Sequence, residues 1–295
     1  MTILYEKNQY NDPRFPFEIY QTDMTGTIPQ GRGFNDLHWH EELQFTLIKK
    51  GKISIQINGE DLILQENEGI FINSGVLHQM IEMETNSKYH SINFPKELLG
   101  FSPNSRLEIN YVNPYTEKLV LPYLTLHLDS SWQNRILANL LEIEEIYLTI
   151  QERDFAWQYQ ISILLVESWL ILIRAIKEIP NKEISTKSYL HYERMQIMLQ
   201  FIHEHYFEDT SLNDIAEITN ISISECTRTF KKFTHTTPYN YLINYRIKRS
   251  LDLLLKEDSS ISEIALKVGF NQSSHFIKAF KKQFGYPPKQ YKDFY

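Results

Sequence analysis

The sequence predicts an α+β protein of two domains, in which a small β-barrel with two attached helices precedes an all-α domain. Three observations indicate this fold. Residues 34–95 contain short runs in which apolar and polar side chains alternate, as in strands with one buried face. Residues 132–179 repeat apolar side chains at helical spacing, and residues 212–292 contain two copies of one helical pattern.

Length and charge support a division into two parts. The 295 residues fit roughly two domains of about 150 residues, and an apolar content of 42% is enough for a large core. We expect a sheet domain at 1–130, a helical element at 131–180, a polar linker at 181–192 and a helical domain at 193–295. The net charge of −7 divides into +2 for residues 193–295 and −9 for the rest, so the two parts face different partners.

Nothing in the composition indicates a membrane or an export pathway. The longest apolar run, ISILLVESWLILI (161–173), contains Glu167 and is shorter than the ~20 residues of a membrane span. The stretch MTILYEKNQYNDPRF lacks the pattern of a signal peptide. Because Cys226 is the sole cysteine, no internal disulfide can form, and we expect a reducing cytoplasm.

The strand region carries the turn signals of antiparallel hairpins. The run ISIQI (53–57) leads into Asn58 and Gly59, the dipeptide that best fits a two-residue hairpin turn, and then into LIL (62–64). KKGK (49–52) and QENEG (65–69) are further turn candidates. Several short strands at this spacing favour a small barrel or sandwich.

Two amphipathic helices are expected between residues 132 and 179. Their apolar stripes are Ile136, Leu140, Ile143 and Tyr147 in the first helix, and Trp157, Ile161, Leu164, Leu165, Trp169, Leu172 and Ile176 in the second. The second helix is apolar over much of its circumference and therefore needs partners on two sides. We expect the pair to pack on the sheet domain and to form a homodimer seam, although burial inside one subunit explains the pattern equally well.

The repeat near the C-terminus predicts two helix-turn-helix units, at 211–233 and 262–284. The stretch LNDIAEITNISISECTRTFKKFTHTTPYNYL (212–242) aligns with ISEIALKVGFNQSSHFIKAFKKQFGYPPKQYK (261–292). Each copy is a short helix that begins near Ser211 or Ser262, a tight turn, and a longer helix. The N-cap candidates of the longer helices are Ser222 and Asn271.

The two longer helices should bury one stripe and expose another. Phe276, Phe280 and Phe284 recur every four residues in the second copy, and Cys226, Phe230 and Phe233 take their place in the first. Short polar groups near the start of the exposed face, with cations further along, are what a helix entering the DNA major groove needs. The candidate DNA-contacting residues are Ser222, Ser224, Glu225, Thr227, Arg228 and Lys231 in the first helix, and Asn271, Ser273, Ser274, Ile277, Lys278 and Lys281 in the second.

A connecting helix is expected between the two copies, at 238–257. It begins with a proline and carries Leu242, Tyr245, Leu251 and the pair Leu254 and Leu255 for packing against both units. At ~1.5 Å per residue it spans roughly 28 Å. That length could hold the two recognition helices close to the ~34 Å between successive major-groove faces of a duplex.

The second copy resembles the AraC/XylS family of bacterial transcription regulators. The motif IALKVGFNQSSHFIKAFKKQFGYPPKQY (264–291) is similar to the family pattern IAxxvGFxdxSyFxrxFKxxxGxxPxxYR. The first copy departs from it at His235, where Gly is common, and at Asn220, which stands in place of the turn residue Gly269. A helical protein-interaction module is the alternative, but a duplicated motif with matching spacing favours DNA binding.

Histidines near the first expected strand resemble a second known pattern. HWHEELQ (38–44), followed by six residues and Gly51, and NSGVLHQM (73–80) resemble the two cupin motifs, with Gln44 where that family has Glu. The sequence predicts that His38, His40, Glu42 and Gln44 share one face of a strand. Three imidazoles and a carboxylate would make a divalent metal site, but the neutral amide of Gln44 is a poorer ligand. We therefore expect His38, His40, Gln44 and His78 to line a ligand cavity, with no bound metal or other cofactor.

Together the resemblances imply a cytoplasmic, dimeric transcription regulator that is not an enzyme. Its expected partners are double-stranded promoter DNA, a small-molecule effector such as a sugar and, if it is an activator, RNA polymerase. The alternative is a metal-dependent cupin enzyme that carries a DNA-binding tail. The sequence leaves the effector, the operator and the sign of regulation open.

Overall fold

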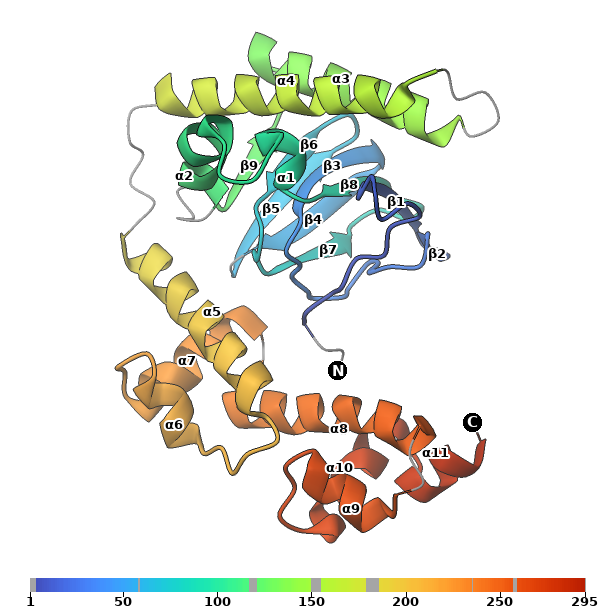
Figure 1. The fold of residues 1–295 in the computed structure, drawn as a ribbon, viewed down its shortest axis with the longest axis vertical. Coiled ribbons are helices and arrows are strands. Elements are labelled where there is room, and N and C mark those ends of the chain that lie inside the picture. The colour runs from blue at the N-terminus through green and yellow to red at the C-terminus, as the bar shows by residue number, and fades with distance from the viewer. Residues whose placement is uncertain are drawn as a thin grey trace. The chain divides into compact units, whose positions relative to one another are not determined.

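The computed structural model divides the chain into two compact units, which we describe separately (Figure 1). It describes residues 4–57, 59–116, 121–149, 155–178, 186–234, 236–256 and 259–294. The N-terminal unit, Leu4–Ser185, contains the strands, and the unit that begins at Thr186 is helical. The predicted order of a sheet-rich domain followed by a helical domain is therefore confirmed.

Antiparallel strands of the N-terminal unit form two sheets. The larger has the order β2-β1-β8-β3-β6-β9 and the smaller the order β5-β4-β7. The strands are β1 (Glu18–Asp23), β2 (Gly26–Ile28), β3 (Leu43–Lys50), β4 (Lys52–Ile57), β5 (Glu60–Gln65), β6 (Gly69–Ile72), β7 (His78–Glu82), β8 (Lys88–Phe94) and β9 (Tyr123–Leu126). Strand β4 follows the expected alternation, since Ile53, Ile55 and Ile57 are fully buried and their neighbours are not. The closed barrel form remains a prediction.

The expected turns lie between the strands. Strand β3 ends at Lys50 and β4 begins at Lys52, with Gly51 between them at a φ of 77° that glycine adopts without strain. Ile57 pairs directly with Glu60, which is the register of a two-residue hairpin. Asn58, in that turn, lies outside the described residues. QENEG likewise joins β5 to β6.

The described residues of the N-terminal unit also form the helical segments α1 (Glu97–Gly100), η1 (Glu108–Val112), α2 (Asn113–Thr116), α3 (Ser131–Leu148) and α4 (Trp157–Glu178). Helices α3 and α4 lie side by side along the sheets (Figure 1). Leu140 of α3 and Leu172 of α4 are fully buried and share one core with Phe45 and Phe71 of the large sheet. The predicted apolar stripes are thus buried within one subunit, as the alternative interpretation required.

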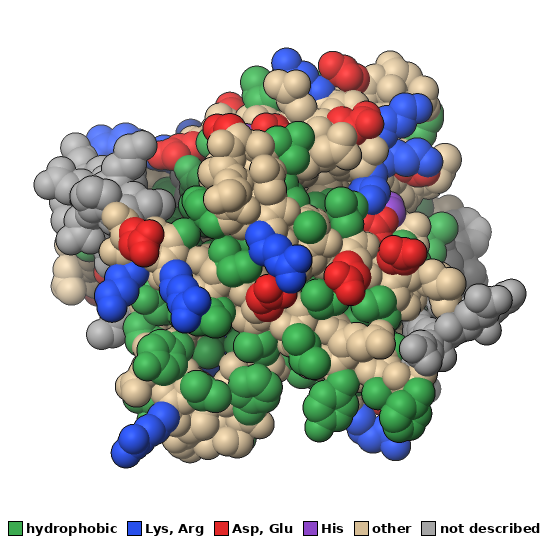
Figure 2. All heavy atoms as spheres, turned by 90° about the horizontal axis from the view of Figure 1, so that it is seen from above, with side chains coloured by type: hydrophobic (Ala, Val, Ile, Leu, Met, Phe, Trp, Pro, Cys, Tyr) green, Lys and Arg blue, Asp and Glu red, His purple; other side chains and the backbone are tan. Residues whose placement is uncertain are grey.

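The opposite side of α4 remains exposed. Tyr159, Ile163 and Leu170 are 75%, 63% and 40% exposed, and they follow one another at helical spacing. Figure 2 looks from the side on which Figure 1 draws these helices, and it shows hydrophobic side chains among both signs of charge. Among the described residues, α4 is the one helix long and apolar enough to cross a membrane. This is weak evidence for a membrane span, because core helices of soluble proteins pass the same test of length and composition.

The C-terminal unit consists of α5 (Thr186–His205), α6 (Leu212–Glu217), α7 (Ile223–Thr234), α8 (Pro238–Lys256), α9 (Ile261–Lys267), α10 (Ser273–Phe284) and α11 (Pro288–Phe294). Two pairs of a short and a longer helix, α6 with α7 and α9 with α10, pack against α8. Residues 186–192, predicted as linker, are instead the first turns of α5. The buried residues Met195, Met198 and Ile202 anchor that helix, and polar composition alone does not distinguish the start of such a helix from a linker. Residues 179–185 lie outside the described chain.

Serine caps set the starts of the short helices. Ser211 and Asp214 form a capping box at α6, as Ser260 and Glu263 do at α9. The second unit therefore begins at Ser260 and not at the predicted Ser262, because only Ser260 has an acidic residue three positions later.

The predicted inner stripes are buried except at Phe284, which is half-buried and packs against the same core. Cys226, Phe230, Phe276 and Phe280 are fully buried, and Phe233 is nearly so. On α8, Leu242 and Leu254 are fully buried, whereas Leu255 is 49% exposed and belongs to the outer surface. The stripe of Phe residues therefore packs inward and leaves the other side of α7 and α10 to solvent.

Candidate functional site

The outer face of α7 is polar and cationic. Ser222, Ser224, Arg228 and Lys231 are exposed, and Thr227 is half-buried. These side chains line one side of a shallow hollow together with Asn213, Ile221 and Ile223. Ser222 caps the helix as predicted, since its hydroxyl accepts from the backbone N–H of Glu225. Neither Arg228 nor Lys231 forms an ion pair with the described residues.

Glu225 lies on the same face but has a partner within the protein. Its carboxylate accepts from Arg194 of α5 at 2.9 Å, and both side chains are partly buried. The ion pair joins the first turn of α7 to α5. Arg194 is thus a residue that the sequence analysis missed, because a pairing across 31 positions has no local signal.

The outer face of α10 repeats this chemistry. Ser274, Lys278 and Lys281 are exposed, Ile277 is 38% exposed, and Ser273 is half-buried. The predicted cap Asn271 is wrong. The N-cap is Gln272, which makes no capping bond, and the side chain of Asn271 donates to Asp209 instead. The first residue of α10 follows too late for Asn271 to reach the free N–H groups of the first turn.

The two turns reach similar backbone geometry with different residues. Asn220 in the first unit has a φ of 51°, and Gly269 in the second has a φ of 87°. Asn is one of the few side chains that tolerate this left-handed region. The departure from the family pattern at Asn220 therefore keeps a left-handed turn. His235, the other departure, lies outside the described residues.

In the N-terminal unit, the predicted histidines converge although they do not share a strand. Strand β3 begins only at Leu43, so His38 and His40 precede it, and a bend at residues 41 and 42 interrupts the extended chain. The expectation of one strand face from His38 to Gln44 is wrong. A pattern of period two cannot show such a bend. Even so, one ring nitrogen each from His38, His40 and His78 lies within 4.8 Å of the other two, and all three rings are buried.

Backbone carbonyls fix the orientation of all three rings. Nδ1 of His38, His40 and His78 lies 2.7, 3.1 and 2.8 Å from the carbonyl oxygens of Asp36, Glu42 and Val76. A carbonyl oxygen can only accept, so Nδ1 of His38 and Nδ1 of His78 carry the proton. His40 has an oxygen acceptor at each ring nitrogen, because Oε1 of Gln44 lies 2.9 Å from its Nε2. Burial lowers the pKa of each ring, to about 3 for His38, and keeps the rings neutral.

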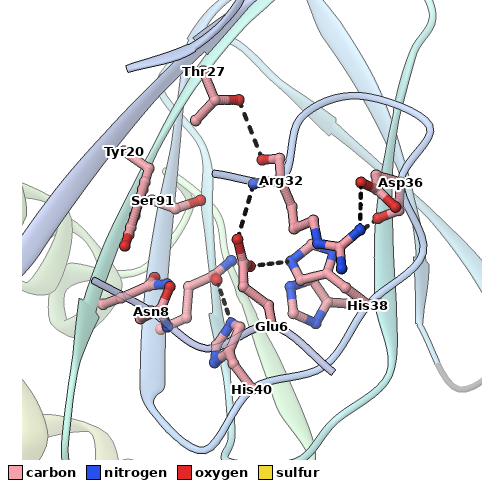
Figure 3. Close-up of polar contacts among 12 residues, drawn as sticks. Glu6, Asn8, Tyr20, Thr27, Arg32, Asp36, His38, His40 and Ser91 are labelled. Atoms are coloured by element: carbon pink, nitrogen blue, oxygen red, sulfur yellow. Dashed lines mark hydrogen bonds and ion pairs between the residues drawn. The ribbon is translucent and has the colours of Figure 1, made fainter. Parts of the chain in front are cut away.

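A segment near the N-terminus brings Glu6 to this cluster (Figure 3). The backbone of Tyr5 pairs with Trp39, and Oε2 of Glu6 lies 3.4 Å from Nε2 of His38. Oε1 of Glu6 accepts from the backbone N–H of Arg32 at 3.0 Å. Burial raises the pKa of the Glu6 carboxyl to about 7, and the positive charge of Arg32 opposes that rise.

Gln44 connects the cluster to a buried polar row. Its Oε1 lies 2.9 Å from Nε2 of His40, and its amide nitrogen donates to Thr46, which bonds to Ser91. A small pocket beside these groups has a free volume of about 10 Å³. It is lined by Glu6, Tyr20, Arg32, His38, Gln44, His78, Met80, Tyr89, Ser91 and Asn93. Glu6 and Arg32 were absent from the predicted site because they lie in segments without a periodic pattern.

Paired helices with cationic outer faces, joined to a sheet domain that contains a polar pocket, define a transcription regulator with a ligand-binding domain. Residues 26–133 match the AraC-like ligand binding domain, and residues 215–293 match the helix-turn-helix domain. The chain belongs to the AraC family of transcription regulators.

Relatives cover both parts of the chain. The uncharacterized HTH-type transcriptional regulator YdeC of Bacillus subtilis (strain 168) is 34% identical over 290 residues, which is 98% of this chain and 96% of YdeC. The melibiose operon regulatory protein of Escherichia coli (strain K12) is 24% identical over 266 residues, 86% of this chain and 82% of that protein. The HTH-type transcriptional activator RhaS of Enterobacter sp. (strain 638) is 29% identical over 97 residues, 33% of this chain and 35% of RhaS.

Proposed function

We propose that α7 and α10 are two recognition helices that read promoter DNA in the major groove. The observation that carries this proposal is the division of each helix into a buried aromatic stripe and an exposed polar and cationic face. Ser224, Thr227 and Arg228 of α7 would reach base edges, as would Ser273, Ser274, Ile277 and Lys278 of α10. Lys231 and Lys281, further along, would contact phosphates, while Ser222 and Asn271 would contact the backbone at the helix starts. Glu225 would take part only if its bond to Arg194 opens.

Alanine substitution at the two central cations tests these faces. We expect Arg228→Ala and Lys278→Ala each to weaken operator binding by about 1–3 kcal/mol, because each removes a donor to a base edge. Lys289→Ala is the matched control, since this exposed cation lies on α11, outside both faces. Titration of the full chain on operator and on random duplexes at fixed salt measures the effect.

A comparison of operator DNA with random DNA distinguishes base contacts from phosphate contacts. A base contact at Arg228 or Lys278 predicts a larger loss on operator than on random DNA, whereas a phosphate contact predicts equal losses. Wild-type affinity of both variants on both duplexes would contradict the assignment of the recognition faces.

We propose further that the effector is a small metabolite such as a sugar, bound beside His38, His40, Gln44 and His78. The ligand-binding domain matched at 26–133 and the name of the melibiose operon regulator support this proposal. The free volume of about 10 Å³ is too small for a sugar, so the segment that carries Glu6 would have to move on binding. This movement would change how a homodimer, held by α3 and α4, presents its recognition helices.

The remaining features of the proposal follow from family membership. The protein would act in the cytoplasm as an activator that contacts RNA polymerase, in keeping with the printed name of RhaS as an activator. It would have no catalytic activity of its own, since its relatives are regulators.

A further inference from the structure

The three imidazoles of the N-terminal unit share a feature that a plain ligand cavity does not require. His38 and His78 each donate the Nδ1 proton to a backbone carbonyl, which leaves a lone pair on Nε2. Nδ1 of His40 also lies beside a carbonyl, but its Nε2 is 2.9 Å from Oε1 of Gln44 and is open to an ion only when that contact is broken. In metal sites, ligating histidines are held in this manner, with the second ring nitrogen donating to a carbonyl or carboxylate. All three rings are buried and their ligand nitrogens lie within 4.8 Å of one another.

His78 shows that the cluster is incomplete without a further group. Its Nε2 is buried and has no hydrogen-bond partner among the described residues. An unpaired acceptor in the interior costs about 1–3 kcal/mol, so such atoms are rare without a reason. Packing alone would be served better by an apolar side chain at this position.

Glu6 supplies the negative charge that the motif itself lacks. Its Oε2 faces the lone pair on Nε2 of His38 at 3.4 Å, and two acceptors at this distance require a proton or a cation between them. A carboxylate also offsets the cost of removing a divalent cation from water. Gln44, in the motif, is neutral. The negative charge therefore comes from Glu6, which lies outside the motif.

The free space favours an ion over an organic molecule. About 10 Å³ is roughly the room that one water molecule needs, and Glu6, His38 and His78 all line it. Imidazole nitrogens with a carboxylate oxygen suit borderline divalent ions such as zinc, iron, cobalt and nickel.

We propose that His38, His40 and His78 bind a divalent transition metal ion, with Glu6 as its carboxylate partner. This differs from the expectation that the sequence alone supported, because Gln44 suggested a site without charge. The ion would be a ligand of the regulator in its own right, and by mass action it would stabilise the folded N-terminal unit. The proposal uses the same pocket as the effector but does not depend on DNA binding.

Metal titration of the full chain, stripped with a chelator, tests the proposal. We expect zinc and cobalt ions to bind stoichiometrically, to raise the melting temperature, and, for cobalt, to produce the visible absorption of a bound ion. His78→Ala should abolish these effects, and Glu6→Gln should weaken binding roughly 10–100-fold. His127→Ala is the control, as His127 lies outside the cluster and pairs with Glu68.

Loss of metal binding in a variant could also result from misfolding, so a variant that should bind metal more tightly is a second test. Gln44→Glu places a carboxylate 2.9 Å from Nε2 of His40, so it should tighten metal binding about tenfold or more. Without metal, the same change should lower the melting temperature, because it buries a charge. Gln65→Glu, on the exposed end of β5, should do neither.

Two results would overturn the proposal. One is a stripped wild-type chain that binds zinc and cobalt no better than His78→Ala, and the other is a Gln44→Glu chain that metal does not stabilise. Either result would leave operator binding by α7 and α10 intact. Loss of operator binding in Arg228→Ala and Lys278→Ala is measured separately, so the two proposals can fail independently.

Discussion

Arg246 shows how a cation in the sequence can serve the fold. It lies close to Lys248 and Arg249 in the sequence, yet it is only 6% exposed. Its guanidinium donates to the carbonyls of Tyr206 and Glu208 at 2.6 and 2.7 Å and lies over the ring of Phe270. It therefore joins the segment after α5 to the second helix pair.

Replacement of Arg246 should destabilise the C-terminal unit. Arg246→Met leaves two carbonyl groups without their donors, so we expect a loss of about 2–4 kcal/mol. Lys282→Met on α10 is the control, because Lys282 is exposed and its replacement should cost within about 0.5 kcal/mol. Calorimetric unfolding of both variants makes the comparison, and equal losses would refute the structural role of Arg246.

Gly269 packs closely against Tyr206 and Arg246. A Cβ there would meet the carbonyl of Tyr206 and lie 2.9 Å from Nε of Arg246. Asn220 shows that the left-handed turn itself does not require glycine. Close packing against Tyr206 is therefore what restricts position 269 to glycine. Because Tyr206 lies 63 positions away in the chain, this contact could not be predicted from the sequence.

At the scale of elements, Glu144 attaches α3 to the large sheet. Its carboxylate accepts from Lys49 of β3 at 2.9 Å and lies 2.8 Å from Nδ1 of His90 on β8. Burial would raise the pKa of Glu144, but the hydrogen bonds from His90 and Lys49 outweigh it and hold the pKa below its ordinary value. Sequence periodicity placed α3 on the sheet, whereas these polar contacts decide where along the strands it lies.

Stability should depend on pH through Glu144. A lowered pKa contributes stability above the ordinary value of 4.5, and that contribution is lost as the pH falls through the folded-state pKa. Glu144→Gln should therefore cost about 1–2 kcal/mol at neutral pH and progressively less in acid. Urea unfolding of both proteins across this range measures it, and a cost that does not change with pH would contradict the argument.

The histidine motif also shows what local sequence patterns cannot predict about the arrangement of strands. Its residue types predicted a cluster, and the geometry agrees, but the strand predicted to carry it begins only at Leu43. Convergence depends on the pairing of His38 with His78 and of Tyr5 with Trp39. Neither pairing has a local signal, and the second one brings in Glu6.

At the scale of the whole molecule, the outer side of α4 is the surface available for a homodimer. Its inner side is used within the subunit, so we expect the predicted seam to form from exposed apolar side chains such as Tyr159, Ile163 and Leu170. Arg135 of α3 and Glu167 of α4 form an exposed ion pair that would lie at the rim of such an interface. The homodimer itself remains a prediction.

A charge placed in this seam should separate the subunits. In Ile163→Glu, two like charges would meet or lose water at the interface, and dimer affinity should fall on the order of 100-fold. Ile63→Glu is the control, because Ile63 is 50% exposed on β5, away from α4. Sedimentation of both variants decides the matter, and a dimer that survives Ile163→Glu places the seam elsewhere.

The sequence by itself determined the order of the two domains, the hairpins of the sheet region, the buried stripes of the helices and the duplicated helix pairs. Each of these follows from local periodicity or turn chemistry, which neighbouring residues express together. The tertiary structure decided that Arg246 is buried, that Arg194 binds Glu225, and that Glu6 joins three histidines. Those contacts join residues far apart in the chain, and only packing of the folded core brings them together.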